Sequence, residues 1–386
     1  MPVNFPLIQT ELQRRADLVD SSTSVNDILQ LLDQINSSTD GKKFEYDSDS
    51  LLPLGDSAYE GMILLSNGAF KVYNAVYDNW DTLDSSSSPE PISGPLWYGS
   101  RGLTIGGDAA VAIGQSVDYY DIATPANAAD WGDTNVNAKQ YIASCAANGT
   151  ALHTAGTSTE NSISYLTIAS LGTAGDFGDM IRTFAFGSGG LSDDTYGIIP
   201  SGNNANAELA YVTIATPGNA ADFGDLTTGR IWLGAANDNT RGLHAGGNIG
   251  TDTNSAFNII DYITIATPGN ATDFGDMSVD CSAMCGTSDT TRAVFTTGWI
   301  EGVSSSNNLE YVTIQTTGNS TDFGDLTTAQ TARSATTNGT YGVVAGGALN
   351  RTDMNYFTIQ TTGNATDFGD LQQQRQYATS TSGAAA

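Results

Sequence analysis

Apolar and polar residues alternate along a short segment that recurs through most of the chain. In the copy at 211–225, Y-V-T-I-A-T is followed by P-G-N and then by A-A-D-F-G-D. Alternation at period two with β-branched residues predicts a strand with one buried face. P-G-N predicts a turn, because Pro fixes φ and Gly or Asn tolerates positive φ. A second short strand then carries the aromatic residue of D-F-G-D inward.

Six copies of this segment are present, and their spacing indicates the architecture. Each copy begins with a tyrosine, followed by an isoleucine three residues later and by an aromatic residue twelve residues later. The tyrosines, 45 to 51 residues apart, are Tyr119, Tyr165, Tyr211, Tyr262, Tyr311 and Tyr356; the isoleucines are Ile122, Ile168, Ile214, Ile265, Ile314 and Ile359; the aromatics are Trp131, Phe177, Phe223, Phe274, Phe323 and Phe368. Two more strands are predicted upstream of each tyrosine, for example 333–337 and 341–345. Four strands in such a period make one propeller blade, so we expect an all-β, six-bladed β-propeller.

The two ends of the repeat region predict how the ring closes. Residues 100–107, S-R-G-L-T-I-G-G, match the second strand at 240–247, so the first repeat lacks its first strand. Residues 374–383 resemble the first strand at 332–339. We therefore expect the C-terminal strand to complete blade one, which leaves no open sheet edge at the seam.

The sequence before residue 96 does not repeat and is predicted to form an adaptor. Apolar periodicity indicates two helices at 7–19 and 25–35, with some apolar positions spaced by seven. Alternation around Asn67-Gly68 predicts a hairpin within 61–83. The predicted division is a helical docking or oligomerisation segment at 1–40, a small β element at 41–83, a Ser/Pro linker at 84–95 and the propeller at 96–386.

The charge balance restricts the possible partners. The chain has 42 Asp and Glu against 14 Lys and Arg, a formal net charge of −28, and no basic run. Such a surface repels phosphate backbones and anionic headgroups, so we expect no nucleic-acid partner. No apolar run approaches the ~20 residues of a membrane span, and the N-terminus lacks a secretory-signal pattern. We therefore expect that the protein does not insert into a membrane. We expect it to be synthesised in a cytoplasm and released by lysis.

Few residues offer reactive chemistry. Cys145, Cys281 and Cys285 form no C-x-x-C pair and are predicted to be buried free thiols. His153 and His244 are the two histidines of the chain, and we predict that each is structural or exposed. No Gly-x-Ser-x-Gly or His-Glu-x-x-His motif is present. We therefore expect no catalytic residue, no metal ligand and no cofactor.

The D-F-G-D motif invites a functional interpretation, because D-F-G also forms the magnesium loop of kinases. Here it occurs six times without a Gly-rich loop, a strand lysine or H-R-D, which favours a structural repeat. The aspartate pairs, such as Asp222 with Asp225 and Asp273 with Asp276, have the hard oxygens that Ca²⁺ prefers. Hydrogen bonding to local backbone amides is the favoured interpretation. Paired carboxylates of a glycosidase stay open as an alternative, although near-identical blades disfavour it.

The repeat resembles two known groups of proteins. Double glycines followed by Tyr and then Trp or Phe resemble kelch-type blades, at Gly106-Gly107, Gly246-Gly247 and Gly346-Gly347. The pattern Y-(V/I)-T-I-(A/Q)-T-x-G-N-A-T-D-F-G-D-L over 100–383 is closer to repeat proteins of tailed phages of marine bacteria, cyanophages among them. That resemblance implies a virion structural protein, such as a tail fibre, tail-tip or decoration protein, and brings no enzymatic residues.

These observations predict a non-enzymatic virion protein that docks to other virion proteins through residues 1–95. The outward propeller would act in host attachment as a tail-fibre or adhesin module that contacts a surface glycan or protein. The alternatives are a capsid or tail cement protein without host contact, and a propeller enzyme acting on surface glycans. We expect a homo-oligomer, and the heptad spacing permits the trimer common among fibres. The predicted specificity loops are 190–207, 248–256 and 301–309.

Overall fold

The computed structural model describes residues 63–66, 69–74, 79–83, 97–108, 115–135, 142–156, 160–183, 189–200, 206–250, 255–348 and 351–383. The chain divides into two units, Met1–Ile92 and Ser93–Ala386. In the first unit, β1 (Ile63–Ser66), β2 (Ala69–Asn74) and β3 (Asn79–Leu83) form an antiparallel sheet in that order. Ser66 pairs with Ala69, which confirms the predicted hairpin. The predicted helices and linker lie outside the described residues.

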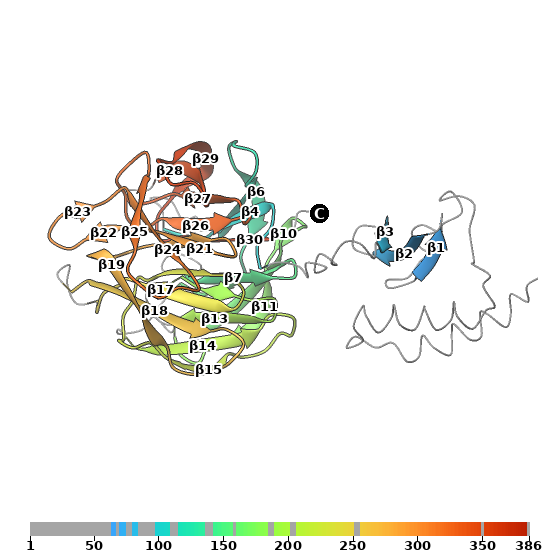
Figure 1. The fold of residues 1–386 in the computed structure, drawn as a ribbon, viewed down its shortest axis with the longest axis horizontal. Coiled ribbons are helices and arrows are strands. Elements are labelled where there is room, and N and C mark those ends of the chain that lie inside the picture. Colours follow the sequence, from blue (N-terminus) through green and yellow to red (C-terminus); the bar gives the residue numbers. More distant parts are fainter. Residues whose placement is uncertain are drawn as a thin grey trace, which may run out of the picture. The chain divides into compact units, whose positions relative to one another are not determined.

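The described residues of the second unit form six antiparallel sheets in a ring (Figure 1), which is the predicted six-bladed β-propeller. No helix occurs in the described part of this unit. The same residues contain no helix with the length and apolarity needed to cross a membrane.

Each blade has four strands that run outward from the central channel in chain order, except that the innermost strand of blade one comes last in the sequence. From the channel outward, blade one contains β30 (Thr379–Gly383), β4 (Arg101–Ile105), β5 (Ser116–Asp121) and β6 (Ala129–Asp133), and blade two contains β7 (Ser144–Ala147), β8 (Thr150–Thr154), β9 (Ser162–Thr167) and β11 (Gly175–Asp179). In the same order, blade three contains β12 (Leu191–Ser192), β13 (Tyr196–Pro200), β14 (Glu208–Thr213) and β15 (Ala221–Asp225), and blade four contains β16 (Gly234–Asn237), β17 (Arg241–Ala245), β18 (Phe257–Thr264) and β19 (Thr272–Ser282). Blade five contains β20 (Gly286–Ser288), β21 (Arg292–Thr296), β24 (Asn308–Thr313) and β25 (Thr321–Asp325), and blade six contains β26 (Ser334–Thr337), β27 (Tyr341–Ala345), β28 (Arg351–Thr358) and β29 (Thr366–Arg375).

The ring closes as the sequence predicts. β30 pairs antiparallel with β4, from Thr379 opposite Ile105 to Gly383 opposite Arg101. Contacts between innermost strands run around the channel in the order β30, β7, β12, β16, β20, β26 and back to β30. The strand at 379–383 is therefore an integral part of blade one, and β4 has no open inner edge.

The repeated strand begins and ends earlier than the alternation predicts. In blade three, β14 begins at Glu208, three residues before the repeat tyrosine, and ends at Thr213. Ile214 therefore lies in the turn, where its N–H donates to the Thr195 carbonyl at 2.9 Å. Its side chain is nevertheless buried. The repeated isoleucine is thus explained by burial between blades, because strand pairing has already ended.

Apolar side chains form six clusters, and each lies between two neighbouring blades. Between blades three and four, for example, Phe223 shares a cluster with Leu233 and Ile265. The six motif aromatics are 2% to 4% exposed, which confirms that D-F-G-D carries its aromatic inward. Burying a large aromatic side chain is worth about 2–3 kcal/mol, so each joint gains cohesion from this position.

Three short strands extend the blades. β10 (Gly172–Thr173) pairs parallel with β6 at the outer edge of blade one. β22 (Trp299–Ile300) and β23 (Ser304–Ser305) form a hairpin that adds to β19.

The predicted specificity loops match the structure only in part. The segment 190–207 is mostly not a loop, because it contains strands β12 and β13 of the framework. The segment 248–256 does lie between β17 and β18, whereas 301–309 contains β23 and the start of β24. A segment whose sequence differs between blades can be a loop or a strand, so sequence divergence alone did not distinguish the two.

Candidate functional site

The innermost strands line the channel with small side chains. Their sequences are TSTSG, SCAA, LS, GAAN, GTS and SATT. Their edges face the next blade without strand pairing, so side chains bridge the gap. Ser192 Oγ donates to the Ala146 carbonyl at 2.7 Å, and Asn237 Nδ2 donates to the Ser192 carbonyl at 2.7 Å. These bonds satisfy buried edge carbonyls and hold the channel in shape.

One end of the channel is covered by Trp97. Its side chain, 8% exposed, lines a cavity of about 60 Å³ with Thr337 and Ser382, near the ends of β26 and β30. The ring of Tyr98 packs edge-on against Trp97, with centroids 4.7 Å apart. Tyr98 also lies against Gly339, where an added Cβ would come within 2.4 Å of its ring. The polypeptide thus closes this end with the first aromatic residues of the propeller.

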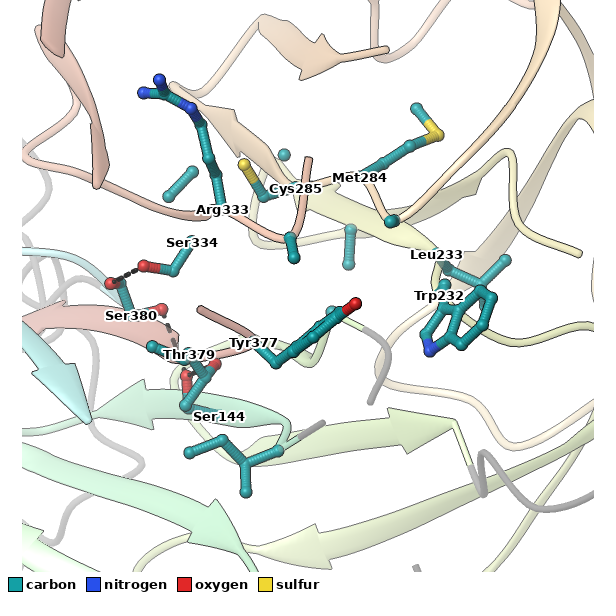
Figure 2. Close-up of a pocket in the computed structure, with 18 of the residues that line it drawn as sticks. Ser144, Trp232, Leu233, Met284, Cys285, Arg333, Ser334, Tyr377, Thr379 and Ser380 are labelled. Atoms are coloured by element: carbon teal, nitrogen blue, oxygen red, sulfur yellow. Dashed lines mark hydrogen bonds between the residues drawn. The ribbon is translucent and has the colours of Figure 1, made fainter. Parts of the chain in front are cut away.

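The opposite end, where the innermost strands begin, holds a cavity of about 90 Å³ (Figure 2). This volume has room for about three water molecules. Sites that enclose a whole small ligand occupy ~300–1,000 Å³. A ligand at this end must therefore be bound mainly by the rim of the cavity, with only a small group inside it.

Four residues at the rim have a left-handed backbone. Trp232, Ala283, Ala332 and Tyr377 have φ of 61°, 51°, 58° and 56°, and all four line the cavity. Each precedes the innermost strand of its blade by two or three residues. Such a conformation costs on the order of 1–3 kcal/mol for a residue other than Gly, and bulky residues tolerate it least. Two blades use alanine here, so the aromatic rings of Trp232 and Tyr377 are not needed to form the turn.

Polar groups border the same cavity. Ser144 Oγ lies 2.6 Å from Thr379 Oγ1, and Ser380 Oγ donates to Ser334 Oγ at 2.7 Å (Figure 2). Arg333 also contributes to the wall.

The guanidinium group of Arg333 is held by protein groups. Its Nη2 donates to Asp353 at 3.0 Å and to Thr328 Oγ1 at 2.6 Å. Its Nε and Nη1 have no hydrogen-bond partner among the described residues, although the side chain is 1% exposed. Two buried donors of this cation are therefore open to a water molecule.

The D-F-G-D motif joins each blade to the next. In blade three, the N–H of Asp225 donates to Asn270 Oδ1 of blade four at 3.1 Å, and the Ala271 N–H donates to the Asp225 carbonyl at 2.7 Å. The same bond from the second aspartate to the turn asparagine joins Asp179 to Asn219, Asp276 to Asn319, Asp325 to Asn364 and Asp370 to Asn127. The final D of the motif and the N of T-x-G-N therefore belong to one contact between blades.

The motif carboxylates lie on the outermost strands, away from the channel. The first aspartate of every copy is exposed: Asp130, Asp176, Asp222, Asp273, Asp322 and Asp367. In the part of the chain that the structure describes, no group of three or more His, Cys, Asp or Glu residues is placed to hold a metal ion. The calcium interpretation of the aspartate pairs gains no support from this geometry.

A buried ion pair connects blades three and four. Arg230 Nη1 lies 2.8 Å from Asp261 Oδ2, and both side chains are 0% exposed. Arg230 Nε also donates to the Gly246 carbonyl at 2.7 Å. Asp261 accepts from the N–H and Oγ1 of Thr227, at 3.1 and 2.6 Å, on the preceding blade. A charge pair without solvent needs such additional partners to offset desolvation.

The seam between blades six and one repeats this arrangement. Arg375 Nη2 lies 2.9 Å from Asp118 Oδ1, and the Gln372 N–H donates to Asp118 Oδ2 at 2.9 Å. Burial raises the pKa of Asp118, and the neighbouring Arg375 opposes that effect. The two Arg–Asp joints lie three blades apart, on opposite sides of the ring.

Both histidines are fully buried, at the fourth position of β8 and of β17. Burial lowers the pKa of His153 to about 4. Burial and Arg230 together lower the pKa of His244 to about 3. The rings are therefore neutral at pH 7. Of the two predicted possibilities, the structural one is confirmed and exposure is wrong.

The three cysteines are buried and free, as predicted. Burial raises the pKa of Cys145 to about 12 and that of Cys285 to about 11. It also raises the pKa of Cys281, with Glu310 adding to the effect. Because the thiolate is the nucleophilic form, these side chains are unreactive at neutral pH.

No protein-family model matches the chain, and no curated protein matches it. The structure therefore defines the class of this protein. It is a six-bladed β-propeller whose channel is covered at one end by Trp97 and bordered at the other end by residues that include Trp232 and Tyr377. Sequence reasoning did not single out Trp97, Trp232 or Tyr377. An alignment of the residues before each first strand would have placed Trp232 and Tyr377 opposite Ala283 and Ala332, which was the available signal.

Proposed function

We propose that this protein is a phage virion structural protein that docks to other virion proteins through residues 1–95. Its propeller acts as a tail-fibre or adhesin-type module that recognises a host-surface glycan or protein. The resemblance of the repeat to proteins of tailed phages motivates the virion location. The distribution of loop lengths supports a recognition role.

Variation in loop length is confined to one end of the propeller, and this observation carries the recognition proposal. The turns between third and fourth strands all have seven residues: 122–128, 168–174, 214–220, 265–271, 314–320 and 359–365. The connections between second and third strands span 106–115, 155–161, 201–207, 246–256, 297–307 and 346–350, and so have five to eleven residues; 297–307 contains the β22–β23 hairpin. The second strand ends beside the start of the innermost strand, as Ala245 pairs with Gly234. The described ends of these connections therefore lie at the same end of the channel as Trp232 and Tyr377.

We propose that the propeller binds without catalysis. Among the described carboxylates, Asp193, Asp238 and Asp289 directly follow innermost strands and accept hydrogen bonds from the backbone of their own turns. Asp118 and Asp261, on third strands, are engaged by arginines, and the first aspartates of D-F-G-D are exposed on the outermost strands. The enzyme alternative requires a carboxylate at the channel that acts on a glycan. It predicts glycan turnover that one carboxylate substitution abolishes.

The second candidate is a cement protein, favoured by the long row of matched contacts between blades. Five asparagine-to-aspartate contacts in the described joints suit a rigid spacer as well as a receptor-binding head. If the protein is a cement protein, its propeller should lie between virion subunits. If it is a recognition protein, its propeller should project outward from the particle. The proposed homo-oligomer, a trimer in the fibre version, is checked by analytical ultracentrifugation of the full chain.

Electron cryo-microscopy of the intact particle tests the location. An outward propeller with its variable-loop end exposed is the expected result, and absence from the particle would overturn the virion proposal. Recognition is tested by replacing 246–256 with the five-residue loop 346–350 of blade six and measuring particle adsorption to host cells. The matched control is Pro217→Thr in the uniform turn, because blades five and six have Thr at that position. Unchanged adsorption after the loop exchange counts against recognition through that loop.

A further inference from the structure

We propose that blade two has a docking position for a partner protein, in which an arginine side chain of the partner stacks on the ring of Tyr165. This position lies on β9, the third strand of the blade, and includes neither the channel nor the connections of variable length. It therefore stands whether or not the variable end of the propeller recognises a host.

The first residue of the second strand covers the repeat tyrosine in five blades. In blades one, four and five this residue is an arginine whose guanidinium carbon lies 4.3–5.0 Å from the ring centroid, in the pairs Arg101–Tyr119, Arg241–Tyr262 and Arg292–Tyr311. In blades three and six it is a tyrosine that packs edge-on against the repeat tyrosine, in the pairs Tyr196–Tyr211 and Tyr341–Tyr356. Covering this ring is therefore a regular feature of the blade.

The arginines that cover a tyrosine also reach the next blade. The Nη1 atom of each donates to the carbonyl of the next repeated isoleucine at 3.0 Å, in the pairs Arg101–Ile168, Arg241–Ile314 and Arg292–Ile359. A guanidinium group in this position is thus held by an aromatic ring and by a backbone acceptor of the neighbouring blade. Both contacts favour a planar cation with several N–H donors.

Blade two lacks this cover. Its second strand begins with Thr150, whose side chain is too short to cover a ring, and no described aromatic ring or guanidinium group stacks on Tyr165. Tyr165 is 37% exposed, whereas the other five repeat tyrosines are partly buried. The repeated isoleucine of the next blade is Ile214, which belongs to the same apolar cluster as Leu152, the residue opposite Tyr165. The chain thus provides the ring and the neighbouring turn but no arginine.

The ring of Tyr165 is nevertheless positioned by its own sheet. Gly175 lies opposite Tyr165 on β11, and a Cβ added to Gly175 would come within 2.3 Å of the ring. The other blades have alanine or threonine opposite the tyrosine, namely Ala129, Ala221, Thr272, Thr321 and Thr366. The ring of Tyr165 therefore packs directly on the backbone of β11. A ring that is already positioned loses little conformational entropy when a partner binds.

Exposed apolar side chains are also concentrated on blade two. Tyr165, Leu171 and Ile181, which are 37%, 58% and 41% exposed, belong to this blade. Among the described residues, no other blade has more than one exposed large apolar side chain. Leu171 lies in the turn after β9, where the other blades have proline or threonine at the same position. Blade two therefore offers a partner protein apolar contacts in addition to the aromatic ring.

Charge favours arginine as the occupant and another protein as its source. The net charge of −28 attracts cationic groups, and a cation over a tyrosine interacts favourably with the negative face of the ring. Of the described arginines, Arg182 and Arg351 are exposed, and each already pairs with a carboxylate, of Glu208 at 2.6 Å and of Asp353 at 3.0 Å. The described part of a second copy thus has no free exposed arginine, which favours a basic segment of a different protein.

The test is saturation-transfer NMR on the full-length protein with three acetylated and amidated tripeptides at about 10 mM, which detects dissociation constants in the millimolar range. Their central residues are arginine, lysine and citrulline, and citrulline keeps the shape of arginine without its charge. We expect the strongest transfer to the arginine side chain, because a planar guanidinium group stacks on an aromatic ring better than an ammonium group does. No transfer to the arginine peptide, or equal transfer to all three, would overturn the proposal.

Thr150→Arg is the decisive variant, because it supplies the arginine that blades one, four and five have at this position. Its side chain is expected to stack on Tyr165 and to weaken binding of the arginine peptide by about fivefold or more, the equivalent of one cation–π contact. The matched control is Thr361→Arg, which adds the same charge to an exposed turn of blade six and should leave binding nearly unchanged at physiological ionic strength. Equal weakening by both variants would mean that charge alone attracts the peptide, which contradicts the proposal.

Two variants of Tyr165 test the ring itself. Tyr165→Ala is expected to weaken binding of the arginine peptide by about fivefold, and Tyr165→Phe, which keeps the ring, should retain most of the binding. Circular dichroism and thermal unfolding check that each variant folds. Thr150→Arg copies residues of other blades and so tests the position even where Tyr165→Ala does not fold. Wild-type binding by folded Tyr165→Ala would overturn the proposal.

The source of the arginine is tested by analytical ultracentrifugation of the wild-type protein and of Thr150→Arg. An unchanged oligomeric state is expected, because the position is assigned to a different protein. Loss of oligomers in Thr150→Arg would instead assign the position to a second copy of this chain and overturn that part of the proposal.

Discussion

Gly224 of blade three meets the backbone of Gly269 of blade four so closely that a Cβ on Gly224 would lie 2.5 Å from the Gly269 carbonyl oxygen. Gly224 also has a φ of 140°, which L side chains rarely adopt. The third residue of D-F-G-D makes the same close approach in the other copies, to the backbone of Gly172, Gly218, Gly318, Gly363 and Ala126. The motif glycine is therefore required by the neighbouring blade as well as by its own conformation.

Gly224→Ala is expected to lower the free energy of unfolding by about 3 kcal/mol or more, because the methyl group forces the two blades apart. Its matched control is Gly269→Ala on the other side of the same contact. Nothing lies within 4 Å of a Cβ at Gly269, so that variant should stay within about 0.5 kcal/mol of wild type. Urea unfolding followed by circular dichroism compares them. Equal stability of the two variants would show that the joint does not depend on this approach.

Asp261→Ala is expected to destabilise the protein by about 3–5 kcal/mol, because it leaves Arg230 buried without its counter-charge. Adding Arg230→Met to Asp261→Ala should recover part of that loss, since no uncompensated charge remains. Blade three already has Ala210 at the position of Asp261, which shows that the fold accepts alanine there. The measurement is a double-mutant cycle by chemical denaturation. A double variant less stable than Asp261→Ala would contradict the desolvation argument.

Stability is expected to fall as the pH is lowered from about 6.5 to about 4, in part through His153. The folded pKa of His153 is about 4, below the 6.5 of an exposed histidine, so only the unfolded chain takes up a proton in this window. The unfolded state is favoured by up to about 3 kcal/mol at the lower end. His153→Val, which copies Val344 of blade six, should flatten the curve of unfolding free energy against pH in this window. A variant with the same slope as wild type would falsify the assignment.

Removal of residues 378–386 is expected to abolish cooperative unfolding of the propeller, because β4 would lose its inner neighbour and the channel its sixth wall. Removal of 384–386 keeps β30 and serves as the control. Differential scanning calorimetry and size-exclusion chromatography give the readout. A shortened chain that melts cooperatively at the temperature of the control would mean that β30 is dispensable.

The fold could be predicted because the same sequence unit recurs six times along the chain. Period-two alternation identified strands, the aromatic at position twelve was correctly predicted to point inward, and the mismatch between the first and last copies identified the seam. The C-terminal end of the repeated strand was harder to predict. Ile214 continues the alternation although it lies in a turn, since burial between blades and burial within a strand select the same residue type.

The site could not be predicted in the same way. Arg230 and Asp261 lie 31 residues apart, and the position of Asp261 holds Asp, Ser, Ala, Glu or Asn in other blades, so no motif marks the pair. Trp97 follows a linker by composition, which hides its place at the channel. The strain at Trp232 and Tyr377 depends on φ, which residue type does not reveal.

The pairing of β30 with β4 also has a consequence for synthesis. Residues 101–105 leave the ribosome early and must wait for residues 379–383, an interval on the order of tens of seconds at ordinary translation rates. During that time the nascent chain has an unpaired strand edge and no closed channel, which invites chaperone binding or pairing with another nascent chain. A chain whose synthesis stops before residue 379 lacks β30, so the ring does not close and the rim of the channel does not form. Translation of residues 379–383 is therefore the step that closes the ring and completes the channel.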